Sequence, residues 1–193
     1  MTLSAEARKA LTTAVTAGVK DCAAKLGEVT FSEWNVDGVT LSLDEAGPFA
    51  DLLASIDNDH YGAHLSFPGG SFLVLCTSKS GYLITNAFTR AVPDRVESIP
   101  KREARSLGEV SNIMLNAMLG HFAKAWDRDI IISSPKTGIA KQRDHLAKAL
   151  ALYREEAPLA ATFLAKLASR RLLSECLLLI FLDKDSVEKI AGR

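Results

Sequence analysis

Residues 106–126 read SLGEVSNIMLNAMLGHFAKAW, and their apolar side chains recur at the three- and four-residue spacing of an α-helix. A carboxylate and two carboxamides are set into this pattern: Glu109, Asn112 and Asn116. At about 100° per residue, these three and Arg105 fall within an arc of roughly 60°, almost opposite the apolar arc. We therefore predict one long amphipathic helix, from about Ala104 to Trp126, that buries one face and presents the other to solvent.

The polar stripe of this helix consists of Arg105, Glu109, Asn112 and Asn116. Asparagine is a poor residue for a helix interior, because its short amide competes with the backbone for hydrogen bonds. A face that only meets solvent is usually built from Lys, Glu, Gln and Arg, which are better helix formers. Two asparagines one turn apart favour a functional surface, with an ordinary solvent-facing side as the alternative reading.

The composition is typical of one globular domain rather than of a nucleic-acid-binding or membrane protein. Hydrophobic residues make up 48% of the 193 residues, and 23 basic side chains balance 23 acidic ones. Such a balance offers no electrostatic footprint for DNA, RNA or an anionic membrane surface. The longest apolar run, CLLLIFL at 176–182, is too short to cross a bilayer.

Three scattered cysteines, without a CxxC pair, argue against a disulfide framework and against a thiolate metal site. We expect Cys22, Cys76 and Cys176 to be reduced thiols in the core. The N-terminal residues lack the basic and apolar regions of a signal peptide, so a cytoplasmic location is expected.

Hydrophobic periodicity and turn residues around the long helix predict one α+β domain spanning residues 1–193. Its largely antiparallel sheet is expected to pack against two long helices. The predicted helices are 4–25, 49–56, 104–126, 140–156 and 186–192. The predicted strands are 29–36 and 38–44 as a hairpin about Asp37-Gly38, the pair within 63–78 about Pro68-Gly69-Gly70, 79–91, 129–135, 161–169 and 174–183. Residues 93–105 are expected to form an exposed connection.

The spacing Glu109-x-x-Asn112, followed after 22 residues by Pro135, resembles the signature of the CheC/CheX/FliY family. Members of that family are phosphatases of phosphorylated CheY-type response regulators. The resemblance covers roughly residues 60–190, and it places residues 1–50 only loosely as a helix and a hairpin. One ExxN helix is present where CheC-like members often carry two, which makes the chain more similar to CheX. Because CheX-like members pair, the resemblance implies a homodimer.

The family resemblance implies that Asn112 orients the attacking water and that Glu109 docks onto the active-site lysine of a phosphorylated receiver domain. Arg105, Asn116 and Pro135 would contact that partner. The Mg²⁺ would belong to the receiver, and no cofactor is expected on this chain. Arg105 stands where the family has Asp or Ser. The alternative is therefore a non-catalytic module that binds the regulator, or a motor or polar scaffold.

Two other patterns in the sequence do not predict a site. His60 and His64 are four residues apart, a spacing that suits a metal only on a helix. The segment that holds them contains a glycine and leads into a predicted strand, so no metal site is expected there. The serine-containing stretch SSPKTG at 133–138 lacks the glycine spacing of a phosphate-binding loop. No metal site is predicted.

Overall fold

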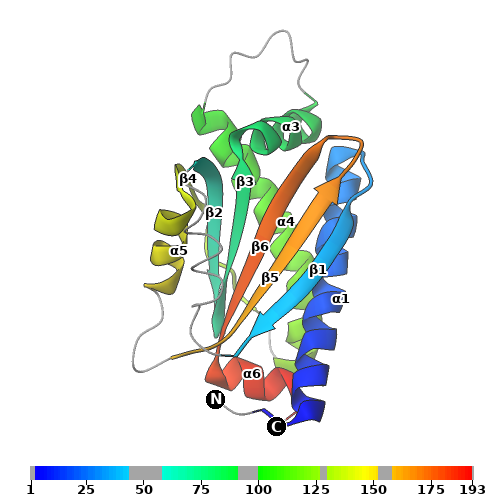
Figure 1. Cartoon of the computed structure of the whole chain (residues 1–193), viewed down its shortest axis with the longest axis vertical. Coiled ribbons are helices and arrows are strands. Elements are labelled where there is room, and N and C mark those ends of the chain that lie inside the picture. The colour runs from blue at the N-terminus through cyan, green and yellow to red at the C-terminus, as the bar shows by residue number, and fades with distance from the viewer. Residues whose placement is uncertain (1–2, 44–57, 91–99, 127–129, 152–157, 193) are drawn as a thin grey trace.

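The computed structural model describes residues 3–43, 58–90, 100–126, 130–151 and 158–192. Within these ranges the chain forms a sheet with the strand order β1-β5-β6-β3-β2-β4, and every neighbouring pair is antiparallel (Figure 1). The strands are β1 Asn35–Ser42, β2 Asp59–Phe67, β3 Gly70–Thr77, β4 Lys136–Lys141, β5 Leu159–Ser169 and β6 Ser174–Asp183.

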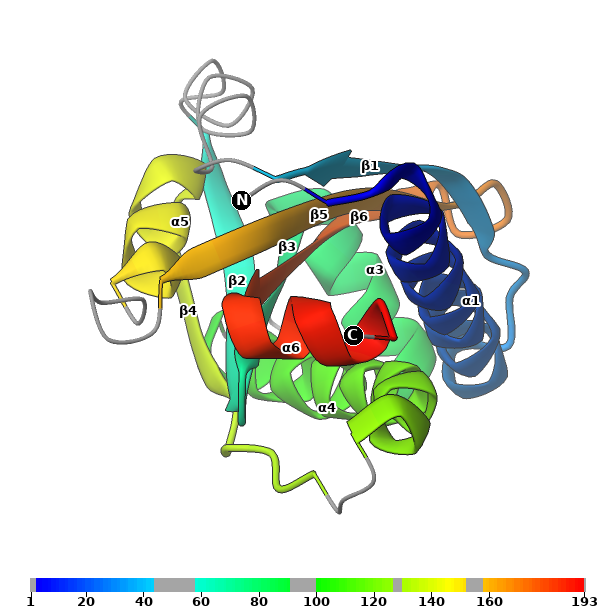
Figure 2. The same ribbon diagram turned by 90° about the horizontal axis from the view of Figure 1, so that it is seen from below.

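Helices cover the two faces of the sheet unequally (Figure 2). One face carries α1 Ala5–Thr30, α3 Ser78–Thr89, α4 Pro100–Trp126 and α6 Lys184–Ile190. The opposite face carries α5 Gln142–Leu150, which packs beside β3, β2 and β4. The α+β fold with an antiparallel sheet and two long helices, of 26 and 27 residues, is confirmed.

Alternation along the central strands produces two separate apolar clusters. In β3, Phe72 and Val74 point into the large cluster beneath α1 and α4, whereas Leu73 and Leu75 point into a smaller cluster beneath α5. This is the two-residue period of a strand that is buried on both faces. The sheet therefore separates the surface around α4 from the surface around α5.

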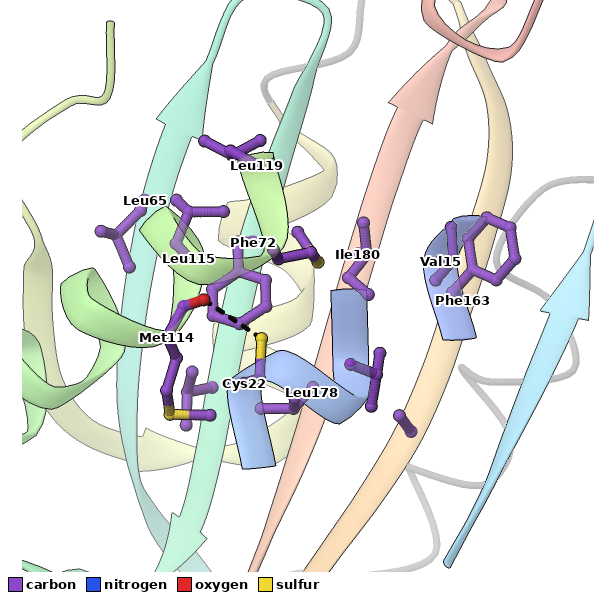
Figure 3. Packing of buried hydrophobic residues seen from close by; sticks show 14 of the residues in the cluster. Val15, Cys22, Leu65, Phe72, Met114, Leu115, Leu119, Phe163, Leu178 and Ile180 are labelled. Atoms are coloured by element: carbon purple, nitrogen blue, oxygen red, sulfur yellow. Dashed lines mark hydrogen bonds between the residues drawn. The ribbon is translucent and has the colours of Figure 1, made fainter. Parts of the chain in front are cut away.

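The two long helices approach closely at a glycine of α1. A Cβ atom at Gly18 of α1 would lie 2.7 Å from Met118 Cγ of α4. One turn along, the Cys22 thiol donates to the Met114 carbonyl oxygen over 3.1 Å (Figure 3). All three cysteines are buried and free of disulfides, as predicted.

The predicted hairpin about Asp37-Gly38 is wrong. Helix α1 continues to Thr30 and ends at Phe31, whose left-handed backbone (φ 51°) acts as the C-cap. The dipeptide lies inside the single strand β1, at an irregularity in the register with β5, and Gly38 has a φ of +84°. A glycine with positive φ serves a bulge as readily as a hairpin turn, and the dipeptide does not distinguish the two.

The predicted strand 79–91 is also wrong, because residues 78–89 form α3. Thr77 caps this helix by accepting a hydrogen bond from the Ser80 backbone N–H over 3.1 Å. The buried positions are Ser80, Gly81, Ile84 and Thr85, which is a helical spacing. This segment is too short and too weakly patterned for periodicity alone to separate helix from strand.

The ends of several other predicted elements shift. Residues 130–135, predicted as part of a buried strand, lie outside any strand, and Ile131 is 80% exposed. Strand β4 begins only at Lys136. Helix α4 begins at Pro100, inside the predicted connection. The predicted helix 49–56 lies outside the described residues, as does the end of the predicted helix 140–156.

The two strand pairs predicted within 63–78 and 161–183 are confirmed. Strands β2 and β3 pair from His60–Thr77 to Phe67–Gly70, with the chain reversing at Pro68-Gly69. Strands β5 and β6 form the second hairpin, and α6 follows two residues earlier than predicted. None of the described helices is both long enough and apolar enough to span a membrane.

Candidate functional site

Helix α4 places the polar stripe on the side of the helix that faces away from the sheet. Arg105, Glu109 and Asn116 are exposed, and Asn112 is half-buried. The opposite arc is buried at Leu107, Val110, Met114, Leu115, Met118 and Phe122. The apolar arc fixes the rotation of α4 about its own axis, and this rotation turns the stripe outward.

The two asparagines of the stripe are connected to each other. The Asn116 side-chain amide donates to the Asn112 backbone carbonyl oxygen over 2.8 Å, and its nitrogen lies 3.5 Å from Asn112 Oδ1. Residues four apart on a helix are neighbours on its surface, so this contact follows from the spacing. Asn116 thereby occupies the space beside Asn112 and restricts the directions that its carboxamide can take.

Pro135, the residue before β4, packs against α4 at Gly108, where the two segments approach closely. A Cβ atom at Gly108 would lie 3.2 Å from Pro135 Cβ and 2.9 Å from Thr137 Cγ2. Gly108 immediately precedes Glu109, so the absence of a side chain at this position lets Pro135 reach the backbone of the helix. The structure therefore places Pro135 against Gly108, the residue before Glu109, although Pro135 and Glu109 are 26 residues apart in sequence.

Beneath the stripe, a buried polar contact joins α4 to the sheet. The Tyr61 hydroxyl of β2 donates to the Glu103 carboxylate of α4, and both residues are about 5% exposed. Burial, followed by the hydrogen bond to this carboxylate and by its charge, raises the pKa of Tyr61 to about 12. The contact holds the first turn of α4 against β2.

Glu103 was missed because the predicted helix began one residue after it. On the helical wheel, extending α4 backward places Glu103 within the apolar arc, about 120° from Glu109. A carboxylate on an otherwise apolar arc predicts a buried partner, because an unpaired buried charge is costly. Tyr61 shares its face of β2 with Ala63 and Leu65, which gives the matching signal from the sheet.

Chemically, the stripe presents a carboxylate and a carboxamide one turn apart on a rigid helix. The Glu109 carboxylate accepts hydrogen bonds and pairs with a cation, whereas the Asn112 carboxamide both donates and accepts. Such a pair suits insertion into a pocket on another protein that holds a cation and a reactive water. The roles of Arg105, Glu109, Asn112, Asn116 and Pro135 stay predictions.

No protein-family model and no curated protein sequence matches this chain significantly. Solved structures do match it. FliY from Thermotoga maritima has a TM-score of 0.67 at 14% identity, covering 98% of this chain and 96% of that chain. CheX from Desulfovibrio desulfuricans has a TM-score of 0.58 at 11% identity, covering 88% of this chain and 99% of that chain.

A third match is FliM from the FliM–SpeE complex of H. pylori, with a TM-score of 0.67 at 10% identity and coverage of 100% of this chain and 98% of that chain. At such low identity, structural similarity establishes the fold. The chain therefore has the fold shared by CheX, FliY and FliM; the resemblance of its ExxN helix predicted CheX and FliY, and FliM is added by the comparison of structures.

Proposed function

We propose that this chain is a phosphatase that hydrolyses the aspartyl phosphate of a CheY-type response regulator. The observation that supports this proposal most strongly is the position of Glu109 and Asn112, which share the outward face of α4. The Asn116 amide beside Asn112 and the packing of Pro135 on Gly108 add two neighbours of the predicted site.

In the proposed reaction, Asn112 holds a water molecule in line with the scissile bond between phosphorus and the aspartyl oxygen. The water oxygen attacks phosphorus, the bond to the aspartyl oxygen breaks, and the products are inorganic phosphate and the aspartate carboxylate. The Mg²⁺ of the receiver neutralises the phosphoryl oxygens. The contribution of this chain is to position the water, for which a carboxamide on a rigid helix is well suited.

Glu109 provides the docking contact in this proposal. Its carboxylate would pair with the active-site lysine of the receiver and so set the register in which Asn112 enters. Arg105 lies one turn before Glu109 on the exposed face and would meet acidic groups at the rim of the receiver. A cytoplasmic location and pairing as a homodimer are parts of the same proposal, and light scattering on the purified chain tests the pairing.

The direct test measures the loss of radiolabelled phosphate from a CheY-type receiver in the presence of this chain. The wild-type chain is expected to accelerate the loss, and Asn112→Ala is expected to reduce the acceleration by about 100-fold, because the water is no longer held. Asn35→Ala is the matched control, since Asn35 is an exposed asparagine on the edge strand β1.

Binding of the receiver is measured on the same variants. Asn112→Ala should leave the dissociation constant largely unchanged, whereas Glu109→Ala should weaken it by removing the charge-assisted contact. A wild-type chain that binds the phosphorylated receiver without shortening its lifetime would contradict the phosphatase proposal.

A non-catalytic function is the second candidate, and the similarity to FliM structures favours it. FliM matches this chain with the same TM-score as FliY, 0.67, and the matching FliM structures include complexes with FliG and with SpeE. Arg105 is the further point in its favour, because the family resemblance expects Asp or Ser there. Under this candidate, the chain would use its fold as a scaffold or docking module, and Asn112→Ala would change no rate.

A further inference from the structure

A cavity of about 350 Å³ lies on the face of the sheet opposite to the polar stripe, between α5 and the strands β2 and β4. Figure 1 shows α5 beside these two strands, away from α1. We name it the α5 cavity, and it is lined by His64, Lys136, Thr137, Gly138, His145, Lys148 and Ala151. The cavity brings together His64 of β2 and residues 136–138 of the SSPKTG stretch, which are far apart in the sequence.

Two glycines lie opposite each other on the floor of the α5 cavity, and they have different surroundings. Gly62 of β2 pairs with Gly138 of β4, and two residues further on His64 pairs with Lys136. A Cβ atom at Gly138 would meet nothing within 4 Å, whereas one at Gly62 would overlap the ring of His145. The imidazole of His145 therefore lies directly over the Gly62 backbone and forms a wall of the cavity.

Hydrogen bonds hold one wall of the cavity and leave a polar atom free. His145 Nε2 lies 3.1 Å from the His60 carbonyl oxygen, and since a carbonyl only accepts, this nitrogen carries the hydrogen. His60 itself is held between the Asn58 carbonyl, at 2.9 Å, and the Gln142 amide, at 2.8 Å. By contrast, His64 Nε2 is buried and has no hydrogen-bond partner within the described part of the chain.

The electrostatic surroundings of the cavity are positive. Burial, then the charge of Lys136, then His145, lower the pKa of His64. The pKa of His145 is also lowered, chiefly by burial and with Lys148 and His60 contributing, against the raising effect of the His60 carbonyl and of Asp144. Both rings are thus neutral near pH 7, and each gains a proton most readily when a negative charge arrives beside it.

We propose that the α5 cavity binds a small dianion of the phosphate class. The ammonium groups of Lys136 and Lys148 donate to its oxygens, the imidazoles of His64 and His145 line the site, and the open space over Gly138 provides the room. The volume is at the low end of the range for small-molecule sites, about 300 to 1,000 Å³, which fits a phosphate group with little attached to it. This site is independent of the proposed phosphatase activity.

The experiment records the imidazole ¹H–¹³C NMR signals of the wild-type chain at constant ionic strength while inorganic phosphate or sulfate replaces chloride. Saturable shifts of the His64 and His145 signals are expected, with His121 as the internal reference because it lies on α4 beside Asp21. Sulfate stays dianionic between pH 6 and pH 8, so its affinity reports protonation of the protein alone. It should bind at least about threefold more tightly at pH 6, because binding draws protons onto the two rings.

Matched variants locate the binding. The double substitution Lys136→Gln with Lys148→Gln should weaken sulfate binding by about tenfold, and Lys20→Gln, at an exposed lysine of α1, should not. Gly138→Val, which fills open space on the floor, should also weaken it. The proposal is overturned by shifts that do not saturate, by equal affinity in the Lys136/Lys148 and Lys20 variants, or by histidine shifts that appear with Zn²⁺ and not with either dianion.

Discussion

Asn116 shows how one residue supports another on the same face of a helix. Its amide donates to the Asn112 backbone carbonyl and lies beside the Asn112 side-chain oxygen. The bond is exposed, so its net value is on the order of 0.5–1.5 kcal/mol. The bond to the backbone fixes the Asn116 amide, and in the proposed reaction its approach to Asn112 Oδ1 limits the directions that the Asn112 carboxamide can take.

Asn116→Ala is therefore expected to reduce the acceleration of receiver dephosphorylation by about three- to tenfold, which is less than the loss in Asn112→Ala. Alanine is the better helix former, so the free energy of unfolding should stay the same or rise by up to about 0.6 kcal/mol. Phosphate-release kinetics and urea denaturation on one preparation check both parts. A lower stability with an unchanged rate would contradict the positioning role.

The contact between Tyr61 and Glu103 supports the same helix from below, at the cost of burying a carboxylate. Tyr61→Phe keeps the ring and removes the only donor that the described residues offer to Glu103. The expected loss in the free energy of unfolding is about 1–3 kcal/mol, the cost of an unsatisfied buried acceptor. Urea denaturation measures it, and a loss below about 0.5 kcal/mol would mean that the contact is incidental.

The pH dependence of this contact has a definite sign. An unfolded tyrosine loses its proton near pH 10, whereas the pKa of Tyr61 in the folded protein is about 12. Its contribution to stability is therefore complete below pH 10 and is lost as the pH rises toward 12. Between pH 9 and pH 11.5 the wild-type chain should lose more stability than Tyr61→Phe. Parallel curves for the two proteins would contradict this assignment.

Single residues were predictable from sequence where their environment follows from one element alone. The outward position of Glu109 and Asn116 follows from the helical wheel, because the apolar arc fixes the rotation of α4. The partners that come from other elements were not predictable. Gly108 is next to Pro135 and His145 lies over Gly62 only because of the way β4 and α5 pack.

At the scale of elements, the close approach of α1 to α4 depends on Gly18. Gly120 serves as the control position for a substitution there. Gly18 faces Met118, and Gly120 of α4 has open space where a Cβ would be. Both glycines lie inside helices, where replacing glycine by alanine raises the free energy of unfolding by about 1 kcal/mol when the new side chain meets no other atom.

Gly120→Ala should therefore raise the free energy of unfolding by about 1 kcal/mol. Gly18→Ala should be less stable than Gly120→Ala by about 1–3 kcal/mol, because Met118 must move out of a packed interface. Thermal or urea denaturation of the two variants compares them directly. An equal gain in both would show that the helices separate without cost.

The errors at the element scale share a physical cause. Asp37-Gly38 signals a backbone with positive φ, which β1 uses for an irregularity in its pairing with β5. The residues of α3 carry several β-formers, but a capping Thr77 and packing against the sheet decide for a helix. In both cases tertiary contacts override a local preference that is worth less than about 1 kcal/mol per residue.

At the scale of the whole molecule, the sheet is protected at its centre and open at its ends. Strands β6 and β3 are paired on both sides and are covered on both faces by apolar clusters, whereas β1 and β4 end the described sheet and have no fully buried residue. Hydrogen exchange should be slowest in β3 and β6, and fastest among the strands in the two end strands β1 and β4. Exchange in β4 as slow as in β6 would indicate that another chain covers this edge.

The arrangement of the whole chain also separates its two candidate surfaces. The polar stripe of α4 lies on one side of the sheet, and the α5 cavity lies on the other. The packing of an antiparallel sheet against two long helices was predictable from the pattern of strands and helices. The cavity was not, because it requires the β2–β4 register that places Gly62 opposite Gly138.

The most direct test of the central claim is the lifetime of the phosphoryl group on a CheY-type receiver with increasing amounts of the wild-type chain. The account predicts a lifetime that shortens with concentration toward a saturating value, and the effect should disappear when Asn112 is replaced by alanine. A lifetime that stays constant at concentrations where the two proteins bind, or one that shortens equally with Asn112→Ala, would contradict it.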